Sequence, residues 1–291
     1  MKEKQPNQKF IVQQLFNDPT PHHIINTRIV NGIFMLMKHA DLTNQQRDSL
    51  FHLQILVAKK LVRVWQHHQA YLQAQNKLKE QAEKVVYTEQ LRELHIDCSD
   101  ELFLEFDEFL VQVKSTLDYI VNVPKPIIGN NRWTLTTFGK EGKAVTNALN
   151  NLPAEMKKQT NGFNTILIEN NKIWLEETIL ARDKINHYIE GGVDYRSFSV
   201  FKDTKTNEIR VPLWSPDQTI ESFMAICWDN LLKLCESFFA LFISLRTDIS
   251  LITFYHEPEP LDSPRPRWKA IPTPIFQKIL KDRKFKSEKI V

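Results

Sequence analysis

The feature that most constrains the fold is a 40-residue segment, from Asn44 to Glu83, that contains neither glycine nor proline. Apolar residues recur within it at steps of three and four, the spacing of one face of an α-helix. They are Leu50, Leu53, Leu56, Val57, Leu61, Val64, Trp65 and Leu72. We therefore expect one helix of about 30 residues or more. Its second half, from Gln66 to Lys84, is polar with alternating charge, so it either projects from the body or pairs with a later helix.

Five further segments predict helices, because each combines helical spacing of apolar residues with a start or stop signal. They are Ile24 to Lys38, mostly buried; Ser99 or Asp100 to Val121, ended by Pro124 and Pro126; Lys140 to Asn151; Thr165 to Ile189, ended by Gly191 and Gly192; and Ser215 to Arg246, with Pro216 in its first turn. Residues 127–138 are expected to form a loop or a short extended piece. A mainly α fold follows, which the low number of glycines, 7, also favours.

Two segments depart from the helical period. Tyr195 to Phe201 and Glu208 to Trp214 alternate around a turn at Asp203 to Asn207, which predicts a small β-hairpin. Glu257 to Pro274 carries six prolines and predicts an extended linker or arm. We divide the chain into an N-terminal helical region with the long helix (residues 1–95), a helical bundle with the hairpin near 195–214 (residues 96–250) and a Pro-rich basic C-terminal tail (residues 251–291).

The composition is ordinary for a globular protein, with 42% hydrophobic and 25% charged residues. A formal net charge of +3 is too small to indicate nucleic-acid binding, although residues 265–289 hold nine Lys or Arg against two acidic residues. The first residues lack the apolar core of a secretory signal, and the longest apolar runs are too short for a membrane span. The three cysteines fit neither a disulfide framework nor a zinc site, so we expect a cytoplasmic protein.

One short segment carries a chemically useful pair of residues. From Ala181 to Tyr188 the sequence is ARDKINHY, so four residues separate Arg182 from His187 near the end of an expected long helix. This R-x4-6-H pattern, with a polar residue directly after the arginine, resembles the signature of the HEPN superfamily of RNA-cleaving helical bundles. The helix that ends in Lys114–Ile120 is similar to the preceding helix of that bundle. The resemblance covers about residues 98–246.

The resemblance implies a HEPN-like helical bundle that acts as a metal-independent endoribonuclease, with RNA as substrate and with two copies of the chain lining one cleft. It also implies a role as a toxin or defence effector, and hence an antitoxin or regulatory protein as partner. No cofactor, no metal and no membrane are expected.

Histidine and arginine suit this chemistry for physical reasons. An imidazole titrates near neutral pH, so His187 can act as base or acid, and a guanidinium grips phosphate oxygens, so Arg182 is the expected phosphate clamp. On an ideal helix the two residues lie about 140° apart, so a second copy would be needed to complete the site. Asp183 shares the face of His187 and can orient its imidazole. Asn186 and Tyr188 are further supporting residues, for phosphate or guanidinium contacts and for stacking.

Three alternatives stay open at this level. Arg182 and Asp183 can be solvated surface residues, with His187 favoured near a helix C-terminus by the helix dipole. A non-catalytic module of the same fold can bind protein or nucleic acid through its N-terminal helices and basic tail. The third alternative is a purely structural helical protein.

Other candidate groups are weaker. The adjacent pairs His22-His23 and His67-His68 point to different sides of a helix and do not suggest a shared metal. The sequence holds no glycine-rich phosphate loop of either common type, so nucleotide hydrolysis through such a loop is not expected.

Overall fold

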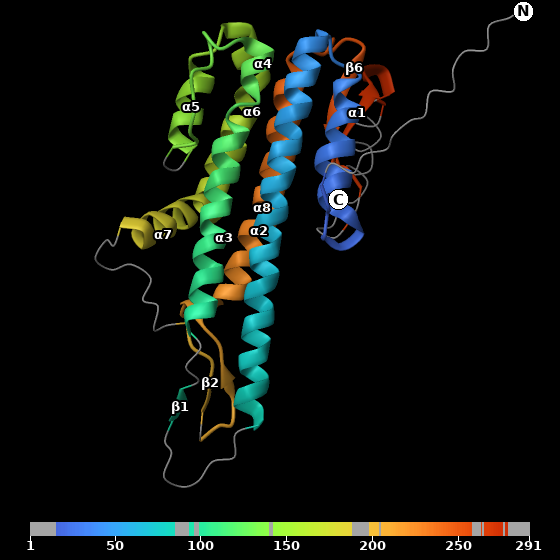
Figure 1. Cartoon of the computed structure of the whole chain (residues 1–291). Coiled ribbons are helices and arrows are strands. Elements are labelled where there is room, and N and C mark those ends of the chain that lie inside the picture. Colours follow the sequence, from blue (N-terminus) through green and yellow to red (C-terminus); the bar gives the residue numbers. More distant parts are fainter. Residues whose placement is uncertain are drawn as a thin grey trace, which may run out of the picture.

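Long helices that run alongside one another form the body of the protein (Figure 1). The structure is a computed structural model and describes residues 16–84, 93–95, 99–139, 142–187, 198–203, 205–257, 263, 265–275 and 277–278. At positions 93–95, 99, 161, 184, 186 and 187 it describes the backbone alone. The described part is mainly helical with small antiparallel sheets, which confirms the predicted fold class.

The long Gly- and Pro-free segment is a single helix, α2 (Asn44–Lys84), as predicted. Its first turn is closed by a reciprocal pair of hydrogen bonds: Thr43 Oγ1 accepts from the Gln46 N–H at 3.2 Å, and Gln46 Oε1 accepts from the Thr43 N–H at 2.9 Å. The polar second half pairs with other elements rather than projecting freely, because Tyr71, Leu78 and further residues of it are buried.

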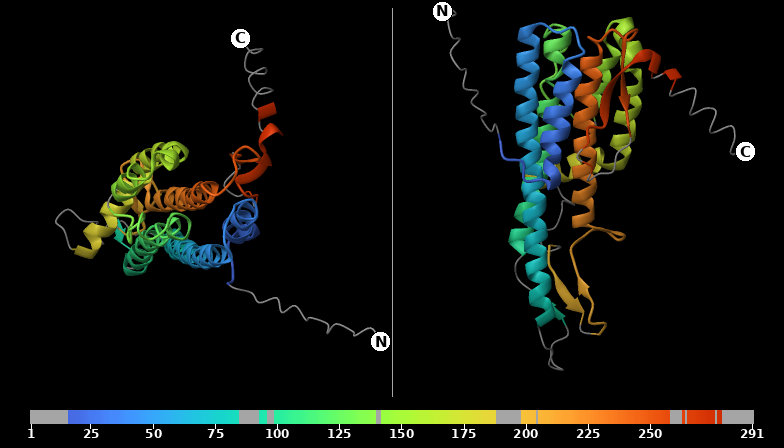
Figure 2. Two further views of the ribbon diagram at one scale, coloured as in Figure 1. Left: turned by 90° about the horizontal axis from the view of Figure 1, so that it is seen from above. Right: turned by 90° about the vertical axis from the view of Figure 1, so that its right-hand side faces the viewer.

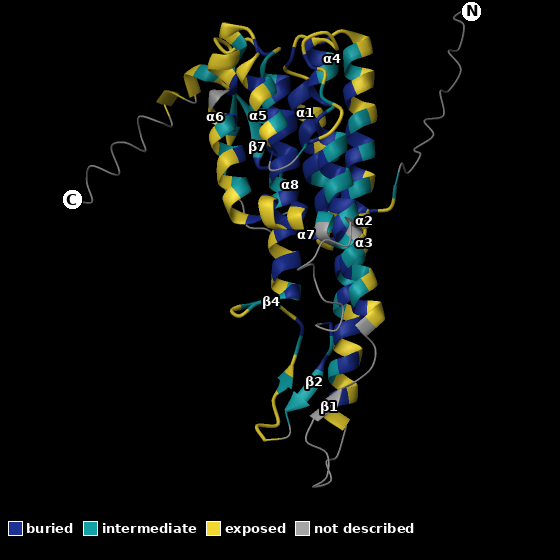
Figure 3. Cartoon of the chain, turned by 90° about the vertical axis from the view of Figure 1, so that its left-hand side faces the viewer, coloured by how far each residue is buried: buried dark blue, intermediate teal, exposed yellow. Residues whose placement is uncertain are grey.

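Helices α3 (Ser99–Ile120) and α8 (Ile220–Ser244) pack against α2 and supply half of the buried aromatic side chains among the described residues. Their buried faces carry the predicted apolar stripes, and the inner sides of the helices are accordingly the buried ones (Figure 3). Fully buried stripe residues are Phe106, Phe109, Leu110, Val113 and Leu117 on α3, and Phe223, Cys227, Leu231, Leu234 and Phe238 on α8. One core cluster extends from Ile24 to Ile243, so residues before and after position 95 share it.

The expected helix over Thr165–Ile189 differs from the structure in two ways. It begins earlier, at Ala154, because Pro153 has an extended conformation (ψ 149°) and starts the helix. It is also interrupted: α6 (Ala154–Asn170) passes through the π-helix η4 (Asn171–Leu175) into α7 (Glu176–His187), which diverges from the axis of α6 (Figure 1). Residues 188 and 189 lie outside the described residues.

The predicted β-hairpin is present with shorter strands than expected, because residues 198–200 lie outside the first strand and Leu213 and Trp214 belong to another sheet. Strand β2 (Phe201–Asp203) pairs antiparallel with β3 (Ile209–Arg210), and Asp203 Oδ1 tightens the turn by accepting from the backbone N–H groups at positions 205 and 206. Residues 195–197 of the prediction lie outside the described residues. The partner strand β1 (Glu93–His95), which pairs with β2, was not predicted, because it is too short for a recognisable alternation.

The predicted start of the last helix at Ser215 is wrong. Residues there form a second small sheet, in which β4 (Leu213–Ser215) pairs with β5 (Gln218–Thr219). Helix α8 starts only at Ile220, because extended Thr219 (ψ 155°) is its N-cap and accepts the Ser222 N–H at 3.1 Å.

The predicted extended arm is also wrong in part. β6 (Ile252–His256) and β7 (Trp268–Pro272) form an antiparallel hairpin that packs against α8 and the N-terminal helices (Figure 2). The prolines between the two strands masked the alternation on either side of them.

Shorter helices complete the described structure. η1 (Pro21–His23), η2 (Asn26–Gly32) and α1 (Ile33–Met37) confirm the buried N-terminal helix, and α5 (Lys143–Asn150) confirms the short helix expected there. Pro124 and Pro126 follow the end of α3, as expected, but they also lie in another short helix, α4 (Pro124–Ile128). This helix extends into residues 127–138, which were expected to form a loop or a short extended piece. Among the described residues, none of the helices combines the length and apolar character that a membrane span requires.

Candidate functional site

Helix α7, which carries the predicted motif, is anchored on its inner side. Thr178 Oγ1 lies 3.1 Å from Cys227 Sγ of α8, and Trp214 Nε1 donates to Glu177 Oε2 at 3.3 Å. Burial raises the pKa of the Cys227 thiol to about 12, so this cysteine is a packing residue and not a nucleophile. The outer side of α7 is open to solvent, since Leu180 is 41% exposed.

Arg182 lies on α7 among acidic groups. Its Nη1 donates to Asp183 Oδ1 at 3.0 Å, and both side chains are partly exposed, at 31% and 19%. Across from it on α3, burial raises the pKa of Asp107, the neighbouring Glu108 raises it further, and the positive charge of Arg182 opposes the shift. The guanidinium is therefore held in place and remains accessible from one side.

The motif histidine sits at the last residue of α7. The side chains of His187 and Asn186, and all of Tyr188, lie outside the described residues, so their predicted roles stay predictions. Helix geometry places position 187 about 20° from Leu180 and about 140° from Arg182. In a single chain, position 187 therefore shares the side of α7 that carries Leu180 and not the side that carries Arg182.

The structure brings together two predicted residues and one that sequence reasoning missed. Arg182 and Asp183 are in contact, and Asp107 joins them electrostatically from α3. The Asp183 carboxylate accepts a hydrogen bond from Arg182, and its predicted role in orienting His187 stays a prediction, because the His187 side chain lies outside the described residues. Asp107 had a weak sequence signal: it is an acidic residue beside the apolar stripe of α3, between Phe106 and Leu110.

The two adjacent histidines on α2 point to different surroundings, as their positions predict. His67 Nδ1 lies 2.8 Å from Glu105 Oε2 near the surface. His68 is buried, and both of its ring nitrogens lack a hydrogen-bond partner in the described part of the chain. Burial lowers the pKa of His68 to about 4, against the attraction of Glu221, so the ring is neutral at pH 7.

Buried polar atoms near His68 include the Tyr71 hydroxyl and the Gln75 amide oxygen, which also lack partners among the described residues. These residues follow His68 on one face of α2, at steps of three and four. Within the described ranges, no three His, Cys, Asp or Glu side chains lie close enough together to hold a metal ion.

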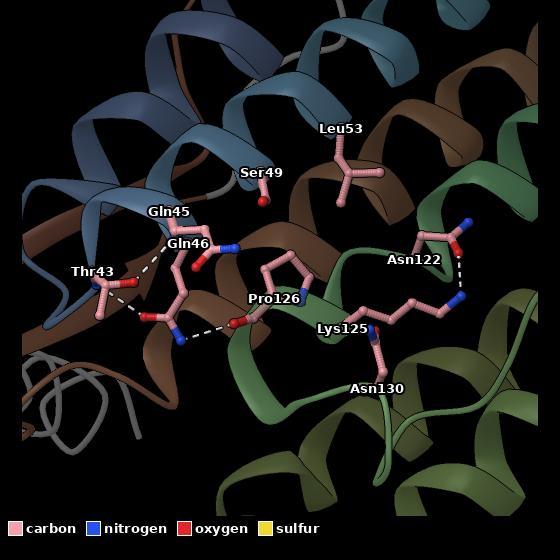
Figure 4. Close-up of a pocket in the computed structure, with 9 residues that line it drawn as sticks. All are labelled: Thr43, Gln45, Gln46, Ser49, Leu53, Asn122, Lys125, Pro126 and Asn130. Carbon is pink, nitrogen blue, oxygen red and sulfur yellow. Dashed lines mark hydrogen bonds between the residues drawn. The ribbon is translucent and has the colours of Figure 1, made fainter.

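A polar cleft of about 580 Å³ lies where α2 begins beside α4 (Figure 4). Gln46 Nε2 donates to the Pro126 carbonyl at 2.8 Å, and Lys125 Nζ donates to Asn122 Oδ1 at 2.7 Å. The Thr43 side chain caps α2 from the same wall. The cleft's best-placed polar groups are thus used in holding α4 against the start of α2, which is a structural task.

Comparisons of this chain with protein-family models, with curated proteins and with solved structures find no match.

Proposed function

We propose that the protein is a metal-independent endoribonuclease of the HEPN type, in which Arg182 clamps phosphate and His187 transfers protons. The observation that carries the proposal is the arrangement of α7: its helix continues through both positions, and it carries a partly exposed arginine that is bonded to Asp183 of the same helix and lies near Asp107 of α3. A guanidinium oriented by a carboxylate is preorganised to meet a phosphate.

The proposed reaction is an internal transesterification of RNA. One imidazole removes the proton from a ribose 2′-hydroxyl, whose oxygen attacks the adjacent phosphorus. The bond to the 5′-oxygen breaks, and that oxygen takes a proton from an acid. The products are a 2′,3′-cyclic phosphate and a 5′-hydroxyl. Arg182 would stabilise the negative charge that develops on the phosphorane oxygens.

We propose that the site is completed by a second copy of the chain. In one chain, position 187 lies on the same side of α7 as Leu180, whose apolar side chain is 41% exposed, while Arg182 lies toward α3. An isologous contact through the Leu180 side would bring the two copies of position 187 together, and each Arg182 would have to reach the shared cleft from the α3 side of its own helix.

The first experiment is cleavage of mixed RNA in EDTA by the wild type and by Arg182→Ala and His187→Ala. We expect each substitution to reduce cleavage at least 100-fold, on the order of the effect of removing a general base or a charge-stabilising donor. Mass spectrometry should find a cyclic phosphate on the fragments. The exposed residues Arg63 and His52 of α2 provide matched controls, Arg63→Ala and His52→Ala, which should keep wild-type activity.

Circular dichroism must first show that all variants are equally helical. Equal cleavage by the wild type and both motif variants, or no cleavage by any of them, would contradict the proposed nuclease.

The dimer is tested separately by Leu180→Glu, which places a charge on the proposed contact. Light scattering should show a dimer for the wild type and a monomer for the variant. Because the proposed site needs both copies, the monomeric variant should also cleave less RNA than the wild type. Met35→Glu alters another exposed apolar residue, on α1, and should leave both unchanged. A monomeric, active wild type would exclude the composite site.

A ribonuclease that acts on cellular RNA must be restrained in the cell that makes it. We therefore propose a cytoplasmic toxin or defence effector with an antitoxin or regulatory protein as partner. Expression of the wild type should arrest growth, whereas His187→Ala should not.

A second candidate function, a non-catalytic module that binds protein or nucleic acid, is favoured by the acidic groups around Arg182. Its basic contact surface would be the C-terminal end, where residues 281–289 hold five Lys or Arg and two acidic residues. Deletion of residues 279–291 leaves β7 intact and tests this surface by RNA gel shift. The second function would be supported if the wild type binds RNA without cleaving it and the deletion variant no longer binds it.

A further inference from the structure

An apolar cavity of about 380 Å³ lies between α6, α8 and the β6–β7 hairpin. Figure 2 shows the hairpin resting against α8, with α6 on its other side. Three aromatic side chains from separate parts of the chain line it: Phe163 from α6, Phe254 from β6 and Trp268 from β7. The volume is within the range of about 300–1,000 Å³ that small-molecule sites have.

Small residues keep this cavity open. Ser237, Ala240 and Ser244 line it from α8 at steps of three and four, and Gly162 lines it from α6. A glycine inside a helix costs about 0.5–1 kcal/mol relative to alanine. No packing constraint requires it here, since a Cβ at position 162 would meet no atom within 4 Å. The space that a larger side chain would fill is left to the cavity.

The polar groups of the lining are few and uncharged. No Lys, Arg, Asp, Glu or His is among the described side chains that form the cavity, so an ionised ligand group would lose its hydration without compensation. A ligand that fits this lining is therefore neutral and largely apolar.

We infer that this cavity binds a small, neutral aromatic molecule. The ring packs between the aromatic side chains over the small residues of α8. The site is separate from the motif on α7, so the inference does not depend on RNA cleavage.

The test is a titration of the full chain with N-phenyl-1-naphthylamine, a neutral aromatic fluorophore. We expect saturable binding of one molecule per chain. Gly162→Leu should weaken it at least tenfold by filling the cavity, while leucine favours the helix more than glycine does. Thr165→Leu adds the same side chain at an exposed position of α6 outside the cavity, and its affinity should stay within twofold of wild type.

Absence of saturable binding, or equal affinity in the two leucine variants, would overturn the inference. The inference would also be overturned if the wild type is a dimer that binds no fluorophore and Gly162→Leu makes it a monomer. The cavity would then belong to a contact between copies of the chain.

Discussion

Two arginine–carboxylate pairs in this protein share their chemistry and differ in their surroundings. Arg28 of η2 bonds Glu236 of α8, which is 208 positions away, with Nε 3.0 Å from Oε2 and side chains only 0% and 2% exposed. Arg182 bonds its neighbour Asp183 on α7, with 31% and 19% of the two side chains exposed.

Because their surroundings differ, the two arginine–carboxylate pairs have different roles. The buried pair joins the N-terminal helices to α8, and Arg267 beside β7 adds a backbone N–H to Glu236 at 3.4 Å. Removing one buried partner leaves an uncompensated charge, whereas an exposed pair is screened by water. The first pair therefore holds distant segments together, and the second keeps its arginine partly exposed to solvent and contributes little to the stability of the fold.

The largest expected effect is that of Arg28→Ala. This substitution removes the ion-pair partner of the buried Glu236 carboxylate and should lower the free energy of unfolding by about 3–5 kcal/mol. Urea denaturation followed by circular dichroism measures this loss. The double variant Arg28→Met with Glu236→Leu removes both charges and should recover most of the stability. A loss below about 1 kcal/mol for the single variant would show that the pair does not hold the N-terminal helices.

The next effect concerns His68, a buried group that is kept neutral instead of being paired. Its folded pKa of about 4 lies below the unfolded value of 6.5, so the unfolded chain binds its proton first. The stability contributed by the neutral ring is present above pH 6.5 and is lost as the pH falls toward 4. Between pH 7 and pH 5 we expect a loss on the order of 2 kcal/mol.

Urea unfolding at both pH values measures that loss. His68→Leu should reduce the difference between pH 7 and pH 5, while His52→Leu, at an exposed position of the same helix, should keep it. An unchanged difference in His68→Leu would mean that other groups set the pH dependence.

The smallest effect on stability is that of Arg182→Ala. Its ion pair is partly exposed, so we expect a change in the free energy of unfolding below about 1 kcal/mol. The same variant should lose RNA cleavage while it keeps most of its stability, whereas the main effect of Arg28→Ala is a loss of stability. If Arg182→Ala unfolds as readily as Arg28→Ala, the arginine is a structural residue and the distinction between the pairs fails.

Much of the helical framework was predictable, because apolar spacing is a local property. The full length of α2 follows from the absence of glycine and proline, and the buried stripe of α8 from Phe223 to Phe238 follows from its period. Short strands were less predictable. β4 and β5 have too few residues for alternation to be visible, and they displaced the start of α8 to Ile220.

Of the candidate site, the sequence indicated the two motif residues and their place on one helix, but not their neighbours. Asp107 comes from another helix, 75 positions before Arg182, and its approach depends on how α3 and α7 pack. The π-helix η4 also had no sequence signal, although it sets the direction in which α7 leaves α6.

The sequence by itself determined where the chain is helical and which side of each helix is apolar, since both depend on residues within a few positions of one another. Three features became visible only in the folded chain. Arg28 bonds Glu236, and the residues that flank the prolines form a hairpin against α8. A cavity also lies beside Gly162. These features depend on contacts between segments far apart in the chain. Such contacts are chosen by the packing of whole faces, which no local pattern specifies.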